Sequence, residues 1–456
     1  MTAPTAPLSH EETAFFGHPR GLSTLFFTEM WERFSYYGMR AFLILYMGKV
    51  LGFDDRHAGS VYGTYAASVW AAAIVGGIIA DRWLGQYKSV LYGGIIIALG
   101  HFTLAFHPLP FFYAGLALIV IGTGLLKPNV SGIVGSLYEQ GDARRDAGFS
   151  IFYMGINLGA AIGPIIAGGI AQKVDWHLGF ACAGVGMTLG LIQYVFGKRH
   201  LQPAIDRLER QRAAAHAERE AAARQGNHGT NTSGEPTWLS FTLVEWKRLA
   251  AMLVFFVFAA VFWGAYEQAG STLQLFADRY TDTRIFGFTF PSSWFASVQA
   301  VFVIILAPAF AWLWTTMGRH EPSTPTKFAA GLFFIGLSFL LLILPGVHLT
   351  NSPLIRVSPL WLIGCYFIQE LGELCISPVG LSVFTKLSPA RLVGSMLGVW
   401  FLADSVGNKV AGYAAGFIST APLPTLFGTT AAVCIGASVI ATILIRPVRS
   451  LMGGIR

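Results

Sequence analysis

The chain has 456 residues, of which 54% are hydrophobic and 12% are charged, and its formal net charge is +7. An ordinary soluble domain holds about 25% charged residues, so the composition excludes a soluble protein. The apolar residues gather in runs close to the ~20 residues that a helix needs to cross a bilayer. The basic residues lie between these runs and form no stripe, which excludes a nucleic-acid-binding protein.

Twelve apolar runs predict an all-α integral membrane protein with 12 transmembrane helices. A polar linker, residues 198–247, divides the runs six and six and indicates two six-helix bundles, at 24–197 and 248–446. Linker residues 207–225 are mostly Ala, Glu and Arg, so we expect a solvated helix there and a flexible stretch at 226–237. The spans are expected at residues 24–50, 57–80, 88–107, 111–137, 147–172, 178–197, 248–278, 291–316, 327–345, 359–385, 391–420 and 425–446.

Positive charge is distributed unequally between the two sides of the predicted spans. Twenty-one of the 31 lysines and arginines fall in the segments that include both termini, and six fall in the opposite segments. Cytoplasmic loops carry the excess of basic residues. We therefore expect a multi-pass protein of the plasma (inner) membrane with a cytoplasmic N-terminus, 1–23, and C-terminus, 447–456. Residues 1–23 contain two glutamates and no apolar core, so no cleavable signal peptide is expected.

The first apolar run carries a polar face. Its polar residues occupy positions 29, 32, 33, 36, 37 and 40, which at about 100° per residue fall within an arc of roughly 140°. An ionisable side chain within the bilayer costs at least ~2.5 kcal/mol. Two glutamates, two arginines and two tyrosines on one face therefore need a water-filled cavity, partner charges, or both.

Other charged residues at matching depths are candidate partners for this face. Lys127 in the fourth run lies level with Glu29 and Glu32, so it can lose its proton or pair with a carboxylate; a static structural ion pair is the alternative. Arg40 and Glu267 lie level in the outer halves of the first and seventh runs. We hypothesise that they form an outer gate, with a permanently formed pair as the alternative.

The second bundle adds carboxylates near the middle of the membrane. Glu370 and Glu373 lie three residues apart on one face of the tenth run. The sequence leaves the role of Asp404 and Lys409 in the eleventh run open, with a helix-packing pair as one possibility. Positive groups in the first bundle and Glu373 in the second would hold both ends of a small zwitterion, and the nearby carboxylates suit proton coupling.

No enzyme chemistry is indicated by the sequence. It has no G-x-x-x-x-G-K-[ST] loop, no nucleophile–base or metal constellation, and no soluble region large enough for a catalytic domain. The four cysteines all lie within apolar runs and are expected to be small buried residues. We expect no enzyme activity and no cofactor, with the proton as the coupling ion.

Several motifs are spread over both halves of the chain. They are Glu29-x-x-Glu32-Arg33-Phe34-x-Tyr36-Tyr37, Ala80-Asp81-Arg82 with Gly85, Gly124-Leu125-Leu126-Lys127-Pro128-Asn129, Phe149-Ser150-Ile151-Phe152-Tyr153-Met154-Gly155-Ile156-Asn157-Leu158-Gly159, Phe276-Ala277-Asp278-Arg279 and Gly372-Glu373-Leu374-Cys375-Ile376-Ser377-Pro378-Val379-Gly380. At these residues the sequence resembles the bacterial type of the proton-dependent oligopeptide transporter family, within the major facilitator superfamily. The resemblance covers nearly the whole chain outside the N-terminus and the linker.

This resemblance implies the major facilitator fold and proton-coupled import of di- and tripeptides by alternating access. It implies that Arg33, Tyr37 and Lys127 receive the peptide carboxylate, while Asn157 and Glu373 hold the amino terminus. The expected partners are peptides, protons and the lipid bilayer, with a monomer as the functional unit. The expected proton-coupling residues are Glu29, Glu32, Lys127 and Glu267. The expected substrate-binding residues are Arg33, Tyr36, Tyr37, Lys127, Asn157, Gln299, Glu373 and Trp400.

Three positions depart from the family pattern. Gln299 stands where an eighth-helix asparagine is usual, Trp70 where a pocket tyrosine is common, and Gly63 where animal relatives use a histidine. Coupling is therefore expected to rest on carboxylates. Two alternatives stay open: a proton-coupled carrier of another small solute, such as nitrate or a peptide-like drug, and a non-transporting membrane sensor that signals through the linker.

Overall fold

The computed structural model describes residues 15–139, 142, 144–225, 241–285, 287–352, 355–389 and 392–453. The expected N-terminal segment up to residue 14, the expected flexible stretch at 226–237 and C-terminal residues 454–456 lie outside the described residues. Nearly all of the described chain is helical, as its apolar runs predict.

The first half of the chain forms one group of long helices. Two of its spans contain a π-helical turn, η1 and η2. The elements are α1 (Arg20–Lys49), α2 (Asp55–Ile79), η1 (Ala80–Leu84), α3 (Gln86–Leu104), α4 (Leu109–Ser136), α5 (Arg145–Gly163), η2 (Pro164–Gly168), α6 (Gly169–Lys173) and α7 (Trp176–Phe196).

The linker helix α8 (Lys198–Gln225) leads to a second group, whose first span is broken by the 3-10 turn η3. A short antiparallel hairpin of β1 (Arg284–Ile285) and β2 (Phe288–Thr289) follows that span. The other elements are α9 (Leu243–Tyr266), η3 (Glu267–Gly270), α10 (Thr272–Tyr280), η4 (Ser292–Trp294), α11 (Phe295–Met317), η5 (Gly318–His320), α12 (Thr324–Asn351), α13 (Leu360–Leu387), α14 (Val393–Ala415), α15 (Leu423–Ile443) and α16 (Ile445–Leu451).

Local sequence signals set several helix starts. At the start of α9, the Glu245 N–H donates to Thr242 Oγ1 at 3.2 Å, and the Thr242 N–H donates to Glu245 Oε2 at 2.8 Å. This reciprocal capping box satisfies two backbone donors that a helix end leaves free. The carboxylates of Asp54 and Asp175 cap α2 and α7 in the simpler one-sided way.

Within the described residues, nine helical segments are long and apolar enough to cross a membrane. α3, α14 and α1 complete a set of twelve, and α1 is set apart by the charged residues in its interior. The twelve expected spans therefore correspond to twelve helical segments. The seventh, Leu243–Tyr280, is longer than expected mainly because it begins at Leu243, ahead of the expected residue 248, and it is broken at η3.

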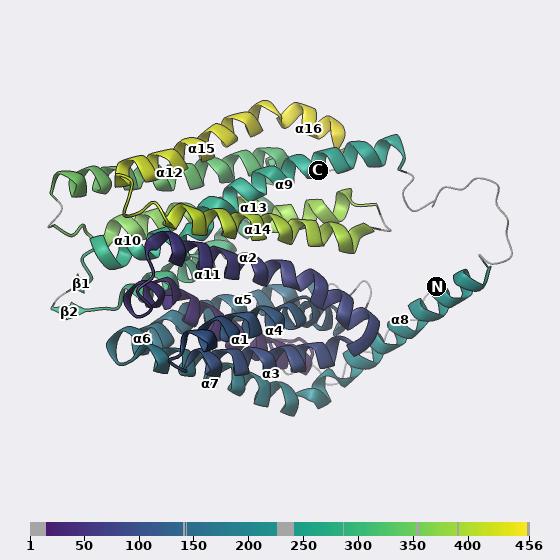
Figure 1. Cartoon of the computed structure of the whole chain (residues 1–456). Coiled ribbons are helices and arrows are strands. Elements are labelled where there is room, and N and C mark those ends of the chain that lie inside the picture. Colours follow the sequence, from purple (N-terminus) through teal and green to yellow (C-terminus); the bar gives the residue numbers. More distant parts are fainter. Residues whose placement is uncertain are drawn as a thin grey trace.

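The two groups of helices lie side by side as two bundles (Figure 1). α1 to α7 fill the lower half of the view, and α9 and α12 to α16 fill the upper half. The hairpin β1–β2 lies at one end of the molecule, here called the hairpin end, and α8 lies toward the other, here called the α8 end. Between the bundles, α2 packs against α14 and α5 packs against α11.

Small residues bring α2 and α14 together. A Cβ added at Gly412 would lie 2.5 Å from the Gly63 Cα, so neither position has room for a side chain. The Ser405 hydroxyl donates to the Ala67 carbonyl at 2.8 Å, and Lys409 Nζ donates to Thr64 Oγ1 at 2.5 Å. The seam between the bundles is therefore tight along these two helices.

The linker helix α8 packs against the first bundle at its start, ahead of the stretch 207–225 for which a solvated helix is expected. Leu201, Ala204 and Ile205 are buried against the first bundle. Arg207 Nη1 donates to the carbonyls of Ser136 and Tyr138 at 2.8 Å each. The docked part of α8 therefore begins at Leu201, before the residues for which a solvated helix is expected.

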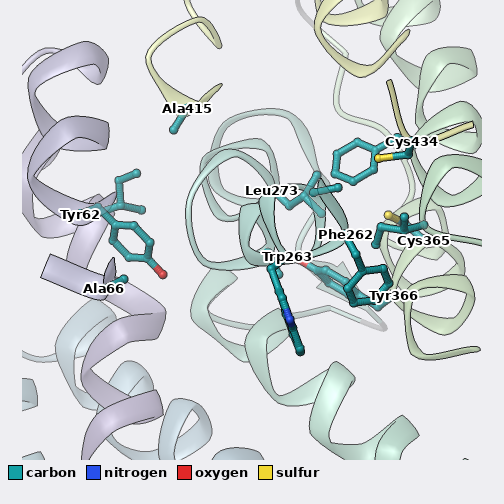
Figure 2. Close-up of a cluster of buried hydrophobic side chains, with 14 of the residues drawn as sticks. Tyr62, Ala66, Phe262, Trp263, Leu273, Cys365, Tyr366, Ala415 and Cys434 are labelled. Atoms are coloured by element: carbon teal, nitrogen blue, oxygen red, sulfur yellow. The ribbon is translucent and has the colours of Figure 1, made fainter. Parts of the chain in front are cut away.

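A single large hydrophobic cluster includes residues from both bundles. Figure 2 shows Tyr62 of α2 on one side and Phe262 of α9 on the other, with the Tyr62 hydroxyl pointing toward the second bundle. Cys365 and Cys434 lie in the same cluster as buried free thiols, as the sequence predicts. The buried core therefore continues across the interface between the bundles.

Candidate transport site

Arg33 is the centre of a buried charged group on α1. Its Nε donates to Glu32 Oε2 in an ion pair and lies 3.3 Å from Glu29 Oε1. Arg33 Nη2, Glu29 Oε2 and Glu32 Oε1 are buried and find no hydrogen-bond partner among the described residues. The two N–H groups on Nη2 thus stay available to a ligand, while two carboxylates hold the Nε.

Two tyrosine rings of α1 lie next to the Arg33 guanidinium. The Arg33 guanidinium lies 5.1 Å from the Tyr36 ring centroid and 5.8 Å from that of Tyr37, within cation–π range. Tyr37 packs against Ala160 of α5 and Ala300 of α11. Tyr37 therefore stands where α1 faces the second bundle.

The second bundle contributes an acidic group on α13. The Tyr266 hydroxyl of α9 lies 2.9 Å from Glu370 Oε1 and 3.2 Å from Glu373 Oε2, and Ser377 Oγ donates to Glu373 Oε1 at 3.1 Å. One hydroxyl hydrogen serves two acceptors, so Glu373 has acceptor capacity left for a ligand. Across the interface, Tyr153 of α5 interacts electrostatically with Glu373.

The other expected binding residues lie near these two groups with their polar atoms engaged locally. Asn157 Nδ2 donates to the Tyr153 carbonyl at 3.0 Å, and Gln299 Nε2 donates to Gln369 Oε1 at 3.0 Å. Trp400 is buried, with its ring 5.3 Å from that of Phe384. Asn157 and Gln299 each keep an amide oxygen that could accept from an ammonium group.

A buried ion pair joins the bundles nearer the hairpin end. Arg40 Nη2 of α1 pairs with Glu267 Oε2 at the start of η3, and Arg40 Nε donates to the Tyr62 hydroxyl at 2.5 Å. The expected gate residues therefore do meet. Among the described residues, no group of three or more His, Cys, Asp or Glu could hold a metal ion.

Comparison with known proteins gives the family. A sequence profile described as "POT family" matches residues 87–207 and 239–431. The chain is 36% identical to "Peptide transporter YePEPT" of Yersinia enterocolitica subsp. palearctica serotype O:3 (strain YE-P4), over 96% of each chain. It is also 36% identical to the "Di-/tripeptide transporter" of Lactococcus lactis subsp. cremoris, over 98% of this chain and 99% of the relative. The chain belongs to the POT family.

A solved structure supports the same assignment. A crystal structure of a point mutant of a peptide transporter POT, in complex with alafosfalin, superposes with a TM-score of 0.85 at 39% identity, over 97% of this chain and 98% of that one. The expected major facilitator fold and multi-pass membrane character are confirmed. The relatives are transporters, which agrees with the sequence-based exclusion of an enzyme.

Lys127 does not pair with a glutamate in this POT member. Arg33 takes both Glu29 and Glu32, and no carboxylate of the described residues lies within ion-pair distance of Lys127 Nζ. The ammonium instead lies 3.2 Å from the centroid of the Trp70 ring. Of the two expected alternatives for Lys127, pairing with a carboxylate is not the one seen in this structure, since equal depth along two helices does not fix which way a long side chain turns.

The polar atoms of Asp404 and Lys409, whose role the sequence leaves open, contact different partners. Asp404 Oδ1 accepts from Asn408 Nδ2 at 2.7 Å, while Lys409 donates to Thr64 of α2. Residues five apart on a helix point about 140° away from one another. The two side chains therefore serve different neighbours.

Sequence reasoning missed several contacts between the bundles. Arg279 forms a two-pronged ion pair with Asp55, at 2.7 and 2.5 Å, and Lys49 Nζ pairs with Asp278 at 2.7 Å. Both lie at the hairpin end and border a cavity of 480 Å³. The Tyr266 bridge to Glu370 was also missed. Opposite charges at the ends of spans indicated that ion pairs could form there, but the sequence did not show which residues pair.

Proposed function

We propose that this POT member is a proton-coupled symporter that imports di- and tripeptides by alternating access. The observation that carries the proposal is the division of charge. A guanidinium with a free donor lies in the first bundle, and a carboxylate pair around Tyr266 lies in the second. A peptide with its carboxylate on Arg33 and its ammonium on Glu373 would span the two bundles and use both groups.

The proposed binding roles follow from which atoms remain available. The free Nη2 of Arg33, next to Tyr36 and Tyr37, receives the peptide carboxylate together with Lys127. Glu373, supported by the amide oxygens of Asn157 and Gln299, receives the ammonium. Trp400, which packs against Phe384 of α13, is proposed to contact the substrate from the second bundle.

Proton coupling is proposed to act through the carboxylates that hold Arg33. When Glu32 takes up a proton, its pull on Arg33 Nε weakens and the guanidinium turns to the substrate carboxylate. Binding of the proton and binding of the peptide then favour each other, which is the reciprocity that symport requires. Glu29 shares this task, and Lys127 and Glu267 complete the set of coupling residues.

The proposed orientation places the α8 end in the cytoplasm and the hairpin end outside. The basic residues of α8 and the loops on its side follow the positive-inside rule. The ion pairs of Arg40 with Glu267, Arg279 with Asp55 and Lys49 with Asp278 support the proposal that contacts at the hairpin end close the outer side. A monomer in the inner membrane, with the proton as coupling ion and no cofactor, is the proposed working form.

Uptake into proteoliposomes tests this function. A labelled dipeptide should accumulate above the outside concentration when the lumen is made alkaline, and collapsing the pH gradient with a protonophore should abolish accumulation. Excess unlabelled di- and tripeptides should compete, while free amino acids and nitrate should not. Competition by nitrate alone would indicate the other-solute carrier, and no uptake of any solute would favour the sensor.

A further inference from the structure

The principal contact of the Lys127 ammonium in this structure is an aromatic face. Its Nζ lies 3.2 Å from the centroid of the Trp70 ring, well within the ≈ 6 Å range of a cation–π interaction. Tryptophan gives the strongest such contact among the aromatic residues.

Trp70 is itself backed by the second bundle. Its ring stacks on Phe401 of α14 with 5.8 Å between centroids and 17° between planes. One turn along the same two helices, Ser405 donates to the Ala67 carbonyl at 2.8 Å. The indole therefore lies between the Lys127 ammonium and Phe401 of α14.

We propose that Trp70 is a positioning residue that holds the Lys127 ammonium in the substrate-free cavity and competes for it with the substrate carboxylate. The proposal rests on the proposed function, in which Lys127 receives that carboxylate. Because the indole stays stacked on Phe401, the ammonium must leave the ring to reach the substrate. The stack of Lys127, Trp70 and Phe401 links α4, α2 and α14, so its strength depends on how closely the bundles meet along the seam.

This competition has a defined kinetic signature. Binding of the carboxylate is weakened by the contact it must displace, and release is helped when the ring takes the ammonium back. Losing the aromatic face should lower the Kd of a dipeptide by about three- to thirty-fold, the factor that corresponds to a cation–π contact of ~0.7–2 kcal/mol. KM and maximal rate should then fall together, because bound substrate leaves more slowly.

Direct binding to the purified full-length protein tests the competition. The variants are Trp70→Leu, which removes the aromatic face, and Trp70→Phe, which keeps a weaker one; Trp312→Leu, at an exposed position of α11, is the matched control. The probes are a dipeptide with a free carboxylate and the same dipeptide as its C-terminal amide. Trp70→Leu should tighten binding of the free acid, Trp70→Phe should lie between it and the parent, and the amide should not respond.

Other outcomes of that experiment overturn the proposal. They are weaker or unchanged binding of the free acid in Trp70→Leu, or an equal gain for the amide. Phe401→Leu removes the backing of the ring and should reproduce part of the gain. A parent protein that binds neither peptide would contradict the proposed function. The contact between Lys127 and Trp70 would then be tested by the thermal stability of substrate-free variants.

A double-mutant cycle on thermal stability measures the contact without substrate. Trp70→Leu and Lys127→Gln are combined in the substrate-free full chain, and the cycle isolates their pairwise interaction. Trp70→Leu should destabilise the parent more than it destabilises Lys127→Gln. Additive effects would show that the ammonium and the ring do not stabilise each other, whatever the transport activity.

Discussion

Arg40 of α1 and Glu267 of η3 form an ion pair that ties the two bundles together near the hairpin end. Both side chains are buried, and Tyr62 accepts a second hydrogen bond from Arg40 at 2.5 Å. Removing one partner of a buried pair costs about 3–5 kcal/mol because it leaves an uncompensated charge. A pair of this kind is suited to hold the outer side shut until substrate and proton bind.

Charge reversal distinguishes a gate, in which the Arg40–Glu267 pair forms and separates, from a pair that stays formed throughout transport. Arg40→Glu places two carboxylates together, so the outer side should open and transport should slow by ten-fold or more. Arg40→Glu combined with Glu267→Arg restores the attraction and should recover part of the rate. The measurement is labelling, from outside, of a single cysteine placed below the pair in a background without the four native cysteines.

The labelling result separates the two interpretations even where transport is lost. A gate predicts a rise in labelling in the single variant and a return toward the parent level in the double variant. Equal labelling in parent, single and double variants would show that the pair only braces the fold.

Glu32→Gln should keep peptide exchange and abolish accumulation driven by a pH gradient. Glutamine preserves the shape beside Arg33 but cannot take up or release a proton, and it pulls less on the guanidinium. Counterflow of labelled dipeptide between equal pools measures exchange, and uptake under an imposed gradient measures coupling. Glu209→Gln, on the exposed part of α8, is the control. Concentrative uptake by Glu32→Gln would remove Glu32 from the coupling residues.

The sequence could predict the twelve spans, the polar face of α1 and the level of its charges, because hydrophobic runs and helical spacing are local properties. It could not predict that Lys127 rests on Trp70, or that Tyr266 bridges Glu370 and Glu373. Depth in the membrane follows from position along one helix. Which faces of two helices meet depends on how the helices pack. Here small residues such as Gly63 and Gly412 let α2 and α14 approach closely.

Two further features of the structure follow from the spacing of residues along single helices. Asp404 and Lys409 lie five residues apart, which helical geometry alone argues against as a pair. The part of α8 that packs against the first bundle begins at Leu201, ahead of the Ala-, Glu- and Arg-rich stretch at 207–225. Both could have been predicted from spacing; the ion pairs of Asp55 and Asp278 required the tertiary structure.

Glu373→Gln should weaken binding of a dipeptide with a free amino group by about 2–5 kcal/mol, the usual cost of truncating one partner of a buried charge pair. The parent should discriminate sharply between a dipeptide and its N-acetylated form in competition assays, and the variant should discriminate little. Glu370→Gln is the matched control, because it removes the neighbouring carboxylate that shares Tyr266. A variant that still prefers the free amine would place the ammonium elsewhere.

His18 connects the segment before α1 to the end of α4, outside the membrane spans. Its Nδ1 lies 2.9 Å from the Tyr138 hydroxyl, and the ring is buried. Burial, and then the nearby Arg144 guanidinium, lower the pKa of His18 below its ordinary value of 6.5, while Asp142 opposes them. The folded protein therefore keeps His18 neutral at a pH where the unfolded chain would take up a proton.

The sign of the resulting pH dependence follows from proton linkage. Below about pH 6.5 the unfolded state binds the additional proton, so the His18 contribution to the free energy of unfolding is complete above that pH and is lost as the pH falls toward the lowered pKa. His18→Gln cannot titrate, so its thermal midpoint should fall less than that of the parent between pH 7.5 and pH 5.5. His57→Gln, at an exposed position near the hairpin end, should behave like the parent. Identical losses in parent and His18→Gln would mean that His18 does not titrate differently in the folded and unfolded states.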